Sequence, residues 1–314
     1  FGSYSGGNRT FLQKKKQIGI LICLFLIAVM VWIFVFTEAR VGFLKVKFLD
    51  VGQGDAEFIE TPDKKQVLID GGPDLSVLEK LGRAMPFYDR YIDLIILTHP
   101  EADHLNGLIE IVKRYDIGAI IMTGVFRNTD QYKEFLNIIK NKKISVYLAK
   151  SGGEIDFGNN IKMDILYPFD NLKGKVISDS NNTSIVAKLI YGNFETLFTG
   201  DIEKGVENKL IKSGLNLKSD ILKIAHHGSK TSSGEEFLKA VNALMAVIEV
   251  GKDNRYSHPH QEVLERLKNL QIFQTGRDGD IKIISDGENF LVNVGTSRSI
   301  GSAASSPCCS PSAT

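Results

Sequence analysis

Residues 94–107 read Leu-Ile-Ile-Leu-Thr-His-Pro-Glu-Ala-Asp-His-Leu-Asn-Gly and carry the strongest signal in the chain. The first four residues are wholly apolar, a pattern typical of a buried strand. Two imidazoles and two carboxylates then fall within six positions, at His99, Glu101, Asp103 and His104. Such mixed nitrogen and oxygen ligands suit divalent ions such as zinc or manganese. Pro100 disfavours helical geometry at His99, so we expect the set on a loop just past the strand.

The remaining histidines support this interpretation. The chain has six, and they fall in three places, at residues 99 and 104, 226 and 227, and 258 and 260. Asp201 follows a second apolar run, and the pair His226 and His227 follows a third at residues 221–225. Three strand ends therefore offer ligands to one region. This arrangement is typical of a two-metal site in which a carboxylate bridges the ions.

Seven motifs connect these residues to a known family. They are residues 48–55 (FLDVGQGD), 68–72 (LIDGG), 99–107 (HPEADHLNG), 181–184 (NNTS), 197–201 (LFTGD), 226–229 (HHGS) and 256–260 (YSHPH). In this order they resemble the metallo-β-lactamase superfamily and, within it, the extracytoplasmic nuclease-like domain of the ComEC family of DNA-uptake proteins. The resemblance implies an α/β (α+β) fold over residues 41–294, a four-layer αββα sandwich.

The strand and helix patterns agree with that architecture. We expect strands that first meander and later alternate with helices, in two similar halves. A last helix over residues 261–270 and a hairpin over residues 276–294 would close the domain.

The resemblance also implies a ligand set for two divalent ions, zinc or manganese. One ion would bind His99 and Glu101, the other Asp103 and His104, and Asp201 would bridge them. Either His226 or His227 would complete the second site, and the sequence does not decide between them. The chain departs from the pattern in two places. Glu101 stands where Asp is usual, and Asn181 and Asn182 occupy a segment where many members have a histidine, which weakens the first site.

Further residues are assigned to supporting roles. We expect hydrogen bonds around the metals from Asp50, Asp55, Asp70 and Asn182, with plain turn chemistry as the alternative for the aspartates. We expect substrate contacts from Ser229, Lys230, Arg255 and Tyr256. Asp103, His258 and His260 are the predicted catalytic residues, with either histidine protonating a leaving alkoxide or binding the scissile phosphate. The alternative for the two histidines is capping of the helix from Gln261.

The N-terminal segment predicts a membrane anchor. Residues 18–36 form an uninterrupted apolar run of a length that spans a bilayer, after a basic tail at residues 1–17. The positive-inside bias places the N-terminus in the cytoplasm and the domain outside the cell membrane, as a single-pass protein. Residues 295–314 are Ser/Ala-rich, which predicts disorder. Because the chain does not begin with Met, we expect a fragment or a processed form.

Composition limits the function classes only weakly. The 314 residues carry a formal net charge of +1, so a phosphate-binding surface must be a local patch. Three cysteines cannot supply a disulfide framework. The leading hypothesis is a membrane-tethered, metal-dependent nuclease that acts on DNA within an uptake channel. A phosphodiesterase for cell-surface polymers, such as phosphorylcholine esters of teichoic acids, is the second. A binding module with a decayed site is the third.

Overall fold

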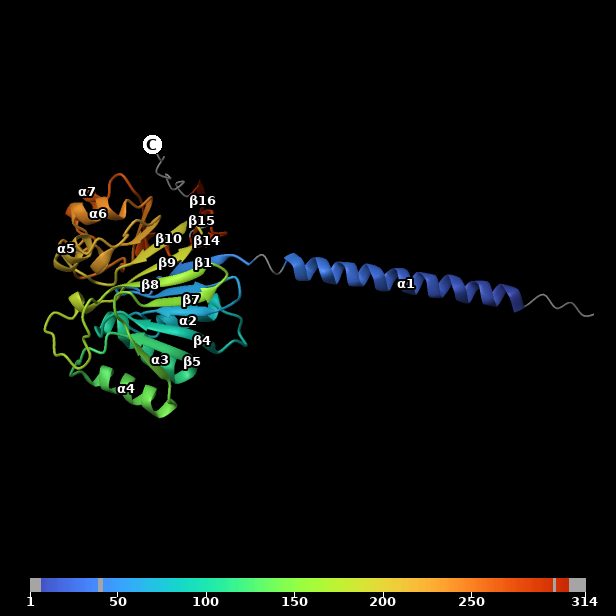
Figure 1. Ribbon diagram of the computed structural model, residues 1–314, viewed down its shortest axis with the longest axis horizontal. Helices are drawn as coiled ribbons and strands as arrows, with labels where there is room; N and C mark the ends of the chain where they lie inside the picture. The colour runs from blue at the N-terminus through green and yellow to red at the C-terminus, as the bar shows by residue number, and fades with distance from the viewer. Residues whose placement is uncertain (1–6, 39–41, 296–297, 305–314) are drawn as a thin grey trace, which may run out of the picture. The chain divides into compact units, whose positions relative to one another are not determined.

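The computed structural model describes residues 7–38, 42–295 and 298–304 (Figure 1). The chain divides into an N-terminal unit, which holds helix α1 (Gly7–Glu38), and a domain that begins at Phe43. Helix α1 covers the predicted span at 18–36 and starts inside the predicted basic tail, of which residues 1–6 lie outside the described part. Its segment Lys15–Trp32 is long and apolar enough to cross a membrane.

The domain contains two sheets. The first has nine strands in the order β16-β15-β14-β1-β2-β3-β4-β5-β6. Their bounds are β1 Leu44–Phe48, β2 Glu57–Glu60, β3 Gln66–Ile69, β4 Tyr91–Leu97, β5 Asp116–Met122, β6 Ser145–Leu148, β14 Ile281–Ser285, β15 Asn289–Val294 and β16 Arg298–Ala304. Strands β1 to β3 meander, and β3 to β6 run parallel.

The second sheet repeats this plan with seven strands in the order β13-β12-β11-β10-β9-β8-β7. Their bounds are β7 Glu154–Gly158, β8 Ile161–Tyr167, β9 Val186–Tyr191, β10 Phe194–Phe198, β11 Ile221–Lys223, β12 Met245–Ile248 and β13 Gln271–Gln274. Strands β7 to β10 are antiparallel, and β10 to β13 are parallel. The two halves are therefore similar, as predicted.

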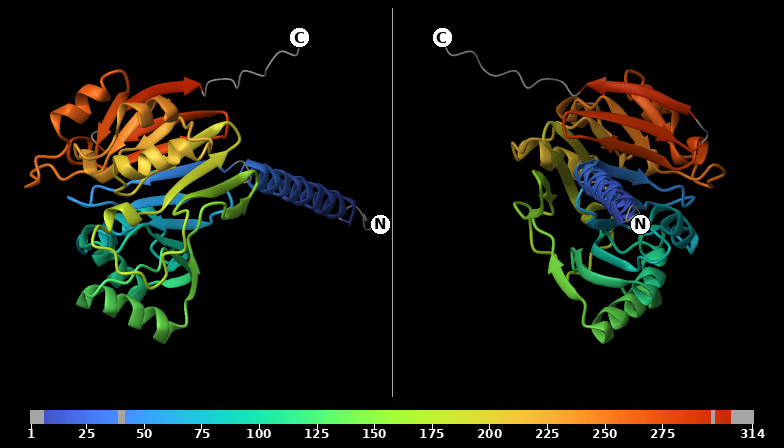
Figure 2. Two further views of the ribbon diagram at one scale, coloured as in Figure 1. Left: turned by 60° about the vertical axis from the view of Figure 1, so that its left-hand side comes forward. Right: turned by 90° about the vertical axis from the view of Figure 1, so that its right-hand side faces the viewer.

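The domain has four layers, and an apolar cluster lies at each of the three interfaces between them. One lies between the sheets and includes Phe48, Phe194 and Phe198. The second packs three helices on the first sheet, namely α2 Ser76–Ala84, α3 Ala102–Arg114 and α4 Asp130–Lys142. The third packs α5 Lys204–Lys212, α6 Glu235–Val241 and α7 Gln261–Arg266 on the second sheet. Figures 1 and 2 show α4 and α5 on opposite outer sides of the sheets, which confirms the predicted αββα sandwich.

Parallel strands bring the polar motifs together. Asp70 follows β3, His99 follows β4, Asp201 follows β10, and the histidine pair follows β11. These carboxyl ends meet at one end of the sandwich, where α/β proteins place their sites.

Three sequence predictions need correction. Asp103 and His104 lie in the first turn of α3 rather than on a loop, because Pro100 excludes helical geometry only at His99 and the helix can begin at Ala102. Helix α7 ends at Arg266, and residues 271–274 form β13, since Phe273 packs between the sheets. The predicted disorder from residue 295 is wrong for 298–304, where β16 pairs with β15 through backbone groups that need no large side chains. Residues 305–314 lie outside the described part.

Candidate metal centre

His104 is fixed by a carboxylate behind it. The Nδ1 atom of His104 lies 2.7 Å from Oδ2 of Asp70. The same Oδ2 accepts a hydrogen bond from the Thr98 hydroxyl at 2.6 Å, and Oδ1 accepts one from the Thr98 backbone N–H at 2.8 Å. Asp70 is fully buried at a left-handed backbone position (φ 53°) at the end of β3. A proton held on Nδ1 leaves Nε2 free, the arrangement in which histidine binds a metal. The predicted supporting role of Asp70 therefore agrees with its geometry.

His227 is held in the same way by a backbone carbonyl. Its Nδ1 lies 2.9 Å from the carbonyl oxygen of Glu249, just past β12. His226 and His227 both have left-handed backbone angles, φ 52° and 53°. Two consecutive left-handed residues turn the chain sharply after β11, so the neighbouring rings take different directions. His227 is 2% exposed and points inward.

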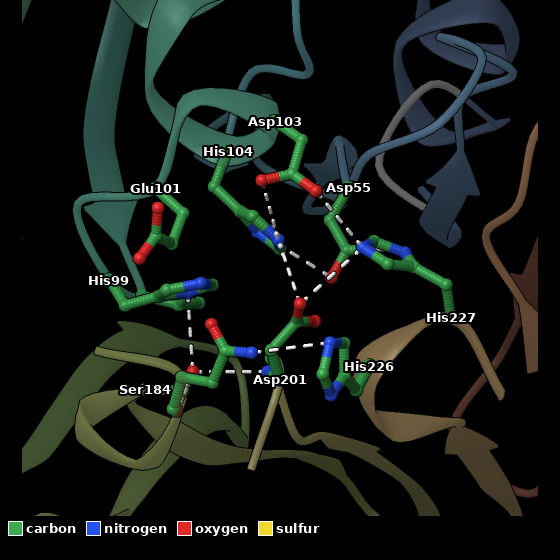
Figure 3. Close-up of polar contacts among 12 residues, drawn as sticks. Asp55, His99, Glu101, Asp103, His104, Ser184, Asp201, His226 and His227 are labelled. Carbon is green, nitrogen blue, oxygen red and sulfur yellow. Dashed lines mark hydrogen bonds and ion pairs between the residues drawn. The ribbon is translucent and has the colours of Figure 1, made fainter. Parts of the chain in front are cut away.

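Asp201 lies between the two rings (Figure 3). Its Oδ2 atom is 3.3 Å from Nε2 of His104 and 3.4 Å from Nε2 of His227. Asp103 approaches from α3, with Oδ2 3.4 Å from Nε2 of His227 and Oδ1 4.0 Å from Nε2 of His104. One candidate ligand atom each of Asp55, His104, Asp201 and His227 lies within 4.8 Å of all the others.

The pKa values reflect this crowding. Burial alone would raise the pKa of Asp201, but the facing His227 and His104 hold it well below its usual range. Burial would lower the pKa of both imidazoles, but Asp201 and the other carboxylates raise each well above the ordinary value. Without metal, protons on the two rings therefore neutralise the carboxylates. A divalent ion would take their place and release them.

The donor set fits a metal ion. The Nε2 atoms of His104 and His227 and Oδ1 of Asp201 are buried, and none makes a hydrogen bond within the described residues. Buried polar atoms normally have a partner, so such a convergence needs an explanation. The imidazoles of His104 and His227 and the carboxylates of Asp103 and Asp201 are suitable ligands for zinc or manganese.

Comparison with known proteins identifies the family. A family model described as the Metallo-beta-lactamase superfamily matches residues 49–248. The chain belongs to this superfamily. The segment that matches begins before Asp55 and ends after His227, so it includes the whole candidate centre.

Relatives of the chain within the metallo-β-lactamase superfamily include three proteins named for competence or recombination. ComE operon protein 3 of Bacillus subtilis is 29% identical over 76% of this chain and 32% of its own length. Recombination protein 2 of Haemophilus influenzae is 28% identical over 87% of this chain and 33% of its own. Competence protein ComA of Neisseria gonorrhoeae is 27% identical over 74% and 31%. The chain thus spans about a third of these relatives, and the predicted resemblance is confirmed.

Solved structures of the superfamily are also similar. The metallo-β-lactamase fold protein YhfI of Bacillus subtilis is 12% identical, with a TM-score of 0.49 over 74% of this chain and 96% of its own.

The first metal position of the superfamily pattern is incomplete. Glu101 forms an ion pair with Arg127 at 2.7 Å and accepts a hydrogen bond from Ser180, so its carboxylate is already engaged. His99 is buried beside His104, with ring centroids 4.2 Å apart, and burial lowers its pKa to about 3. Its Nδ1 contacts Thr98 and Ser184, while its Nε2 makes no hydrogen bond within the described residues. The structure therefore offers His99, but not Glu101, to an ion.

One further predicted residue points elsewhere. Asn182 bonds to Glu203 and Asp179 rather than to the histidines of the centre. Its neighbour Asn181 contacts the histidine outside the centre, with its Nδ2 3.2 Å from Nε2 of His226. Asp50 is held through its backbone N–H by Asp280, 2.9 Å away. This contact involves the backbone of Asp50, and the role of its carboxylate stays a prediction.

Asp55 lies behind the two rings, and its strongest partner was missed by the sequence analysis. It pairs with Lys223, whose ammonium also lies 3.7 Å from Oδ1 of Asp201. Lys223 is fully buried. Burial lowers its pKa, but Asp55 and Asp201 outweigh this effect and raise it. Glu57 and Glu249 lie nearby, close enough to form a second acidic group with Asp55. A signal was present in the sequence for Lys223, a charge that follows two apolar residues in β11, and for Glu249, which directly follows the apolar β12.

The YSHPH motif lines the approach to the centre. His258 stacks near His227 and Tyr256, with ring centroids 6.4 and 5.7 Å apart. A cavity of about 520 Å³ lies beside it, lined by Gln53, Pro73, Glu101, Ala102, Asp103, Asp253, Asn254, Arg255 and Tyr256. Asp103 therefore belongs to the candidate metal centre and also lines this cavity, together with Arg255 and Tyr256. This position suits their predicted contacts with substrate.

The protonation state of His258 differs from that expected of a proton donor. Burial and the neighbouring His227 and His260 lower the pKa of His258 to about 4, so it is neutral near pH 7 rather than half protonated. His260 precedes α7, but its side chain makes no capping bond, which contradicts the capping alternative. Ser229 is buried and contacts Thr231, whereas Lys230 is exposed.

Proposed function

We propose that the domain is a metal-dependent phosphodiesterase that acts on DNA. The observation that carries the proposal is the convergence of His104 and His227, whose Nε2 atoms face Asp201, beside a cavity that Asp103 lines. An ion at this point supplies an activated water and neutralises charge on the phosphate. The competence-related names of the relatives favour DNA as the substrate and a role within an uptake channel.

In this proposal, one ion, zinc or manganese, would be held by His104, His227, Asp103 and Asp201, at the second position of the family pattern. Asp70 and the Glu249 carbonyl orient the rings, and Lys223 and Asp55 fix Asp201 from behind. A second ion would bind at His99 and share Asp201, but more weakly, because Glu101 is paired with Arg127. Arg255 and Tyr256 bind the substrate beside the cavity, and the loop of Ser229 and Lys230 adds polar contacts.

His258 and His260 complete the site next to the substrate. A neutral imidazole at His258 can donate one hydrogen bond to the phosphate or the leaving oxygen. We propose that His258 contributes this hydrogen bond near neutral pH, rather than transferring a proton from a protonated ring.

Helix α1 would anchor the domain as a single membrane span. Arg9 and the lysines at 14–16 precede the apolar segment, which favours a cytoplasmic N-terminus and an extracytoplasmic domain. Residues 18–36 would then span the bilayer and residues 41–294 would form the enzyme.

The proposal is tested by incubating the purified protein with single- and double-stranded DNA and manganese or zinc. We expect metal-dependent cleavage that falls by roughly 10²–10³-fold in Asp103→Ala, the usual cost of removing one electrostatic group from a site. The exposed Asp130→Ala is the matched control and should cleave normally. Turnover of a chromogenic small phosphodiester without DNA cleavage would favour the surface-polymer alternative. A metal-loaded protein without either activity would indicate a decayed binding module.

A further inference from the structure

The end of the domain opposite the candidate metal centre carries two exposed aromatic side chains. Phe87 and Tyr88 are 86% and 75% exposed, more than any other Phe or Tyr whose side chain is described. They occupy the two corners of a turn closed by a 2.9 Å hydrogen bond from the Asp89 N–H to the Pro86 carbonyl. Their rings touch edge to face with centroids 5.3 Å apart. The two rings form a small exposed apolar tip.

The turn is held firmly from behind. The Asp89 carboxylate accepts hydrogen bonds from the side chain of Gln66 at 2.7 Å and from the backbone of Tyr91 at 3.1 Å. These bonds tie the loop between α2 and β4 to the starts of β3 and β4. The aromatic pair therefore projects from a braced support.

Basic side chains surround the turn. Arg90 lies against the ring of Tyr115, 5.3 Å away, and the ammonium of Lys142 donates to the Tyr115 carbonyl at 3.1 Å. Lys143 follows at the exposed end of α4. Asp116 is an exposed acid beside this group, and Asp89 lies in the turn, where its carboxylate is engaged by Gln66 and Tyr91. Arg90 and Lys143 are thus exposed basic residues at this end of the domain.

The course of the chain identifies what faces this surface. Strand β1 begins at the same end, because β1 and β2, and β2 and β3, are antiparallel and β3 and β4 are parallel. Only five residues, 39–43, separate the end of α1 from the start of β1. Even fully extended, they reach about 18 Å. If α1 spans a bilayer, this end of the domain cannot move far from the lipid.

We propose that this end docks on the bilayer surface, with Phe87 and Tyr88 inserted at the headgroup level and Arg90 and Lys143 against anionic lipid phosphates. Aromatic rings are enriched at this depth of membranes, and each basic residue near an anionic surface adds attraction. The inference rests on the proposed tether through α1. This docking would place the metal centre on the far side of the domain from the lipid. The separation would be about 20 Å, the length of a strand of six residues.

The full chain contains one tryptophan, Trp32 in α1, so single-tryptophan variants can report depth. The protein is reconstituted into vesicles of mixed zwitterionic and anionic phospholipid with brominated acyl chains, which quench tryptophan on contact. The wild-type protein reports on α1. Trp32→Phe combined with Phe87→Trp reports on the turn. Trp32→Phe combined with Phe126→Trp is the matched control, because Phe126 is also exposed but follows β5 at the metal end.

We expect Trp32 to be quenched strongly, tryptophan at 87 to show about half that quenching or more, and tryptophan at 126 to show none. Adding Arg90→Gln and Lys143→Gln should reduce quenching at 87. Quenching at 32 without quenching at 87 overturns the docking surface but keeps the tether. If tryptophan at 87 is then also shielded from aqueous iodide, a second copy of the chain covers it instead of lipid. Quenching at 87 without quenching at 32 supports docking and overturns the span.

Discussion

His226 and His227 follow the same strand but point to different partners. His227 lies among the ligand group, whereas His226 is partly exposed and contacts Asn181 and Thr231. We expect His227→Ala to lose the tightly bound ion. His226→Ala is its matched control and should keep the ion, because its ring is outside the group. Metal analysis of the two purified variants decides this, and loss of the ion in His226→Ala alone would reverse the assignment.

The buried acids behind the centre predict how pH affects the metal-free protein. Burial, with Asp55 nearby, raises the pKa of Glu249 to about 8, above its ordinary 4.5. Between these values the folded state binds more protons than the unfolded state, so the free energy of unfolding falls as pH rises. One such group contributes at most about 1.4 kcal/mol per pH unit. Denaturant unfolding at pH 6 and pH 9, with chelator present, should show this loss.

Glu249→Gln should flatten that dependence, and the exposed Glu236→Gln should not. An unchanged slope in Glu249→Gln would show that other groups carry it, with Glu57 next, since burial and Glu249 raise its pKa as well.

The ligand residues could be predicted from sequence because each follows a strand end in a recognisable motif. Among the supporting residues, Asp55 and Asp70 were predicted, but Lys223 was not. Lys223 stands in an apolar run, where periodicity alone favours a strand and gives no reason for the charge. Its role depends on Asp55, which is far away in sequence and close only once the two sheets have packed. Glu101 illustrates the converse. Its position matches a ligand pattern, but Arg127 and Ser180, from other segments, take its carboxylate.

At the scale of elements, helix α3 lies unusually close to the first sheet. Gly107 touches the backbone of Gly71, and a Cβ at residue 107 would lie 1.8 Å from the Gly71 carbonyl oxygen. The Gly71 N–H also donates to the His104 carbonyl at 2.8 Å. Close packing by Gly107 therefore positions His104 against Asp70. The strand patterns predicted the elements themselves, but the close approach of Gly107 to Gly71 brings together different segments, which no local pattern encodes.

Gly107→Ala should destabilise the domain by roughly 1–3 kcal/mol or more, because a rigid backbone must move to admit one methyl group. Gly82→Ala in α2 is the control. Nothing lies within 4 Å of its Cβ position, so the change should stabilise the helix by about 0.5–1 kcal/mol. Denaturant unfolding of both variants measures the difference. Equal effects would show that α3 can shift away from Gly71.

At the scale of the whole molecule, the candidate ligands come from both sheets. Asp103 and His104 belong to the half that builds the first sheet, and Asp201 and His227 to the half that builds the second. The grouping of the histidines after apolar runs predicted that distant segments meet at one polar centre, and the family resemblance added that the two halves form a four-layer sandwich.

This division has a consequence for the order of events in folding. Neither half alone holds the complete ligand set. The ion can therefore bind tightly only after the two sheets have packed together. A ligand that binds only the native state at 100 times its Kd adds about 2.7 kcal/mol. If the site is not yet formed in the folding transition state, this whole free energy slows unfolding, by about 100-fold, and leaves the refolding rate unchanged. Stopped-flow measurements with manganese and with chelator test this. An ion that instead speeds refolding would show that the centre forms early and recruits the second half of the chain.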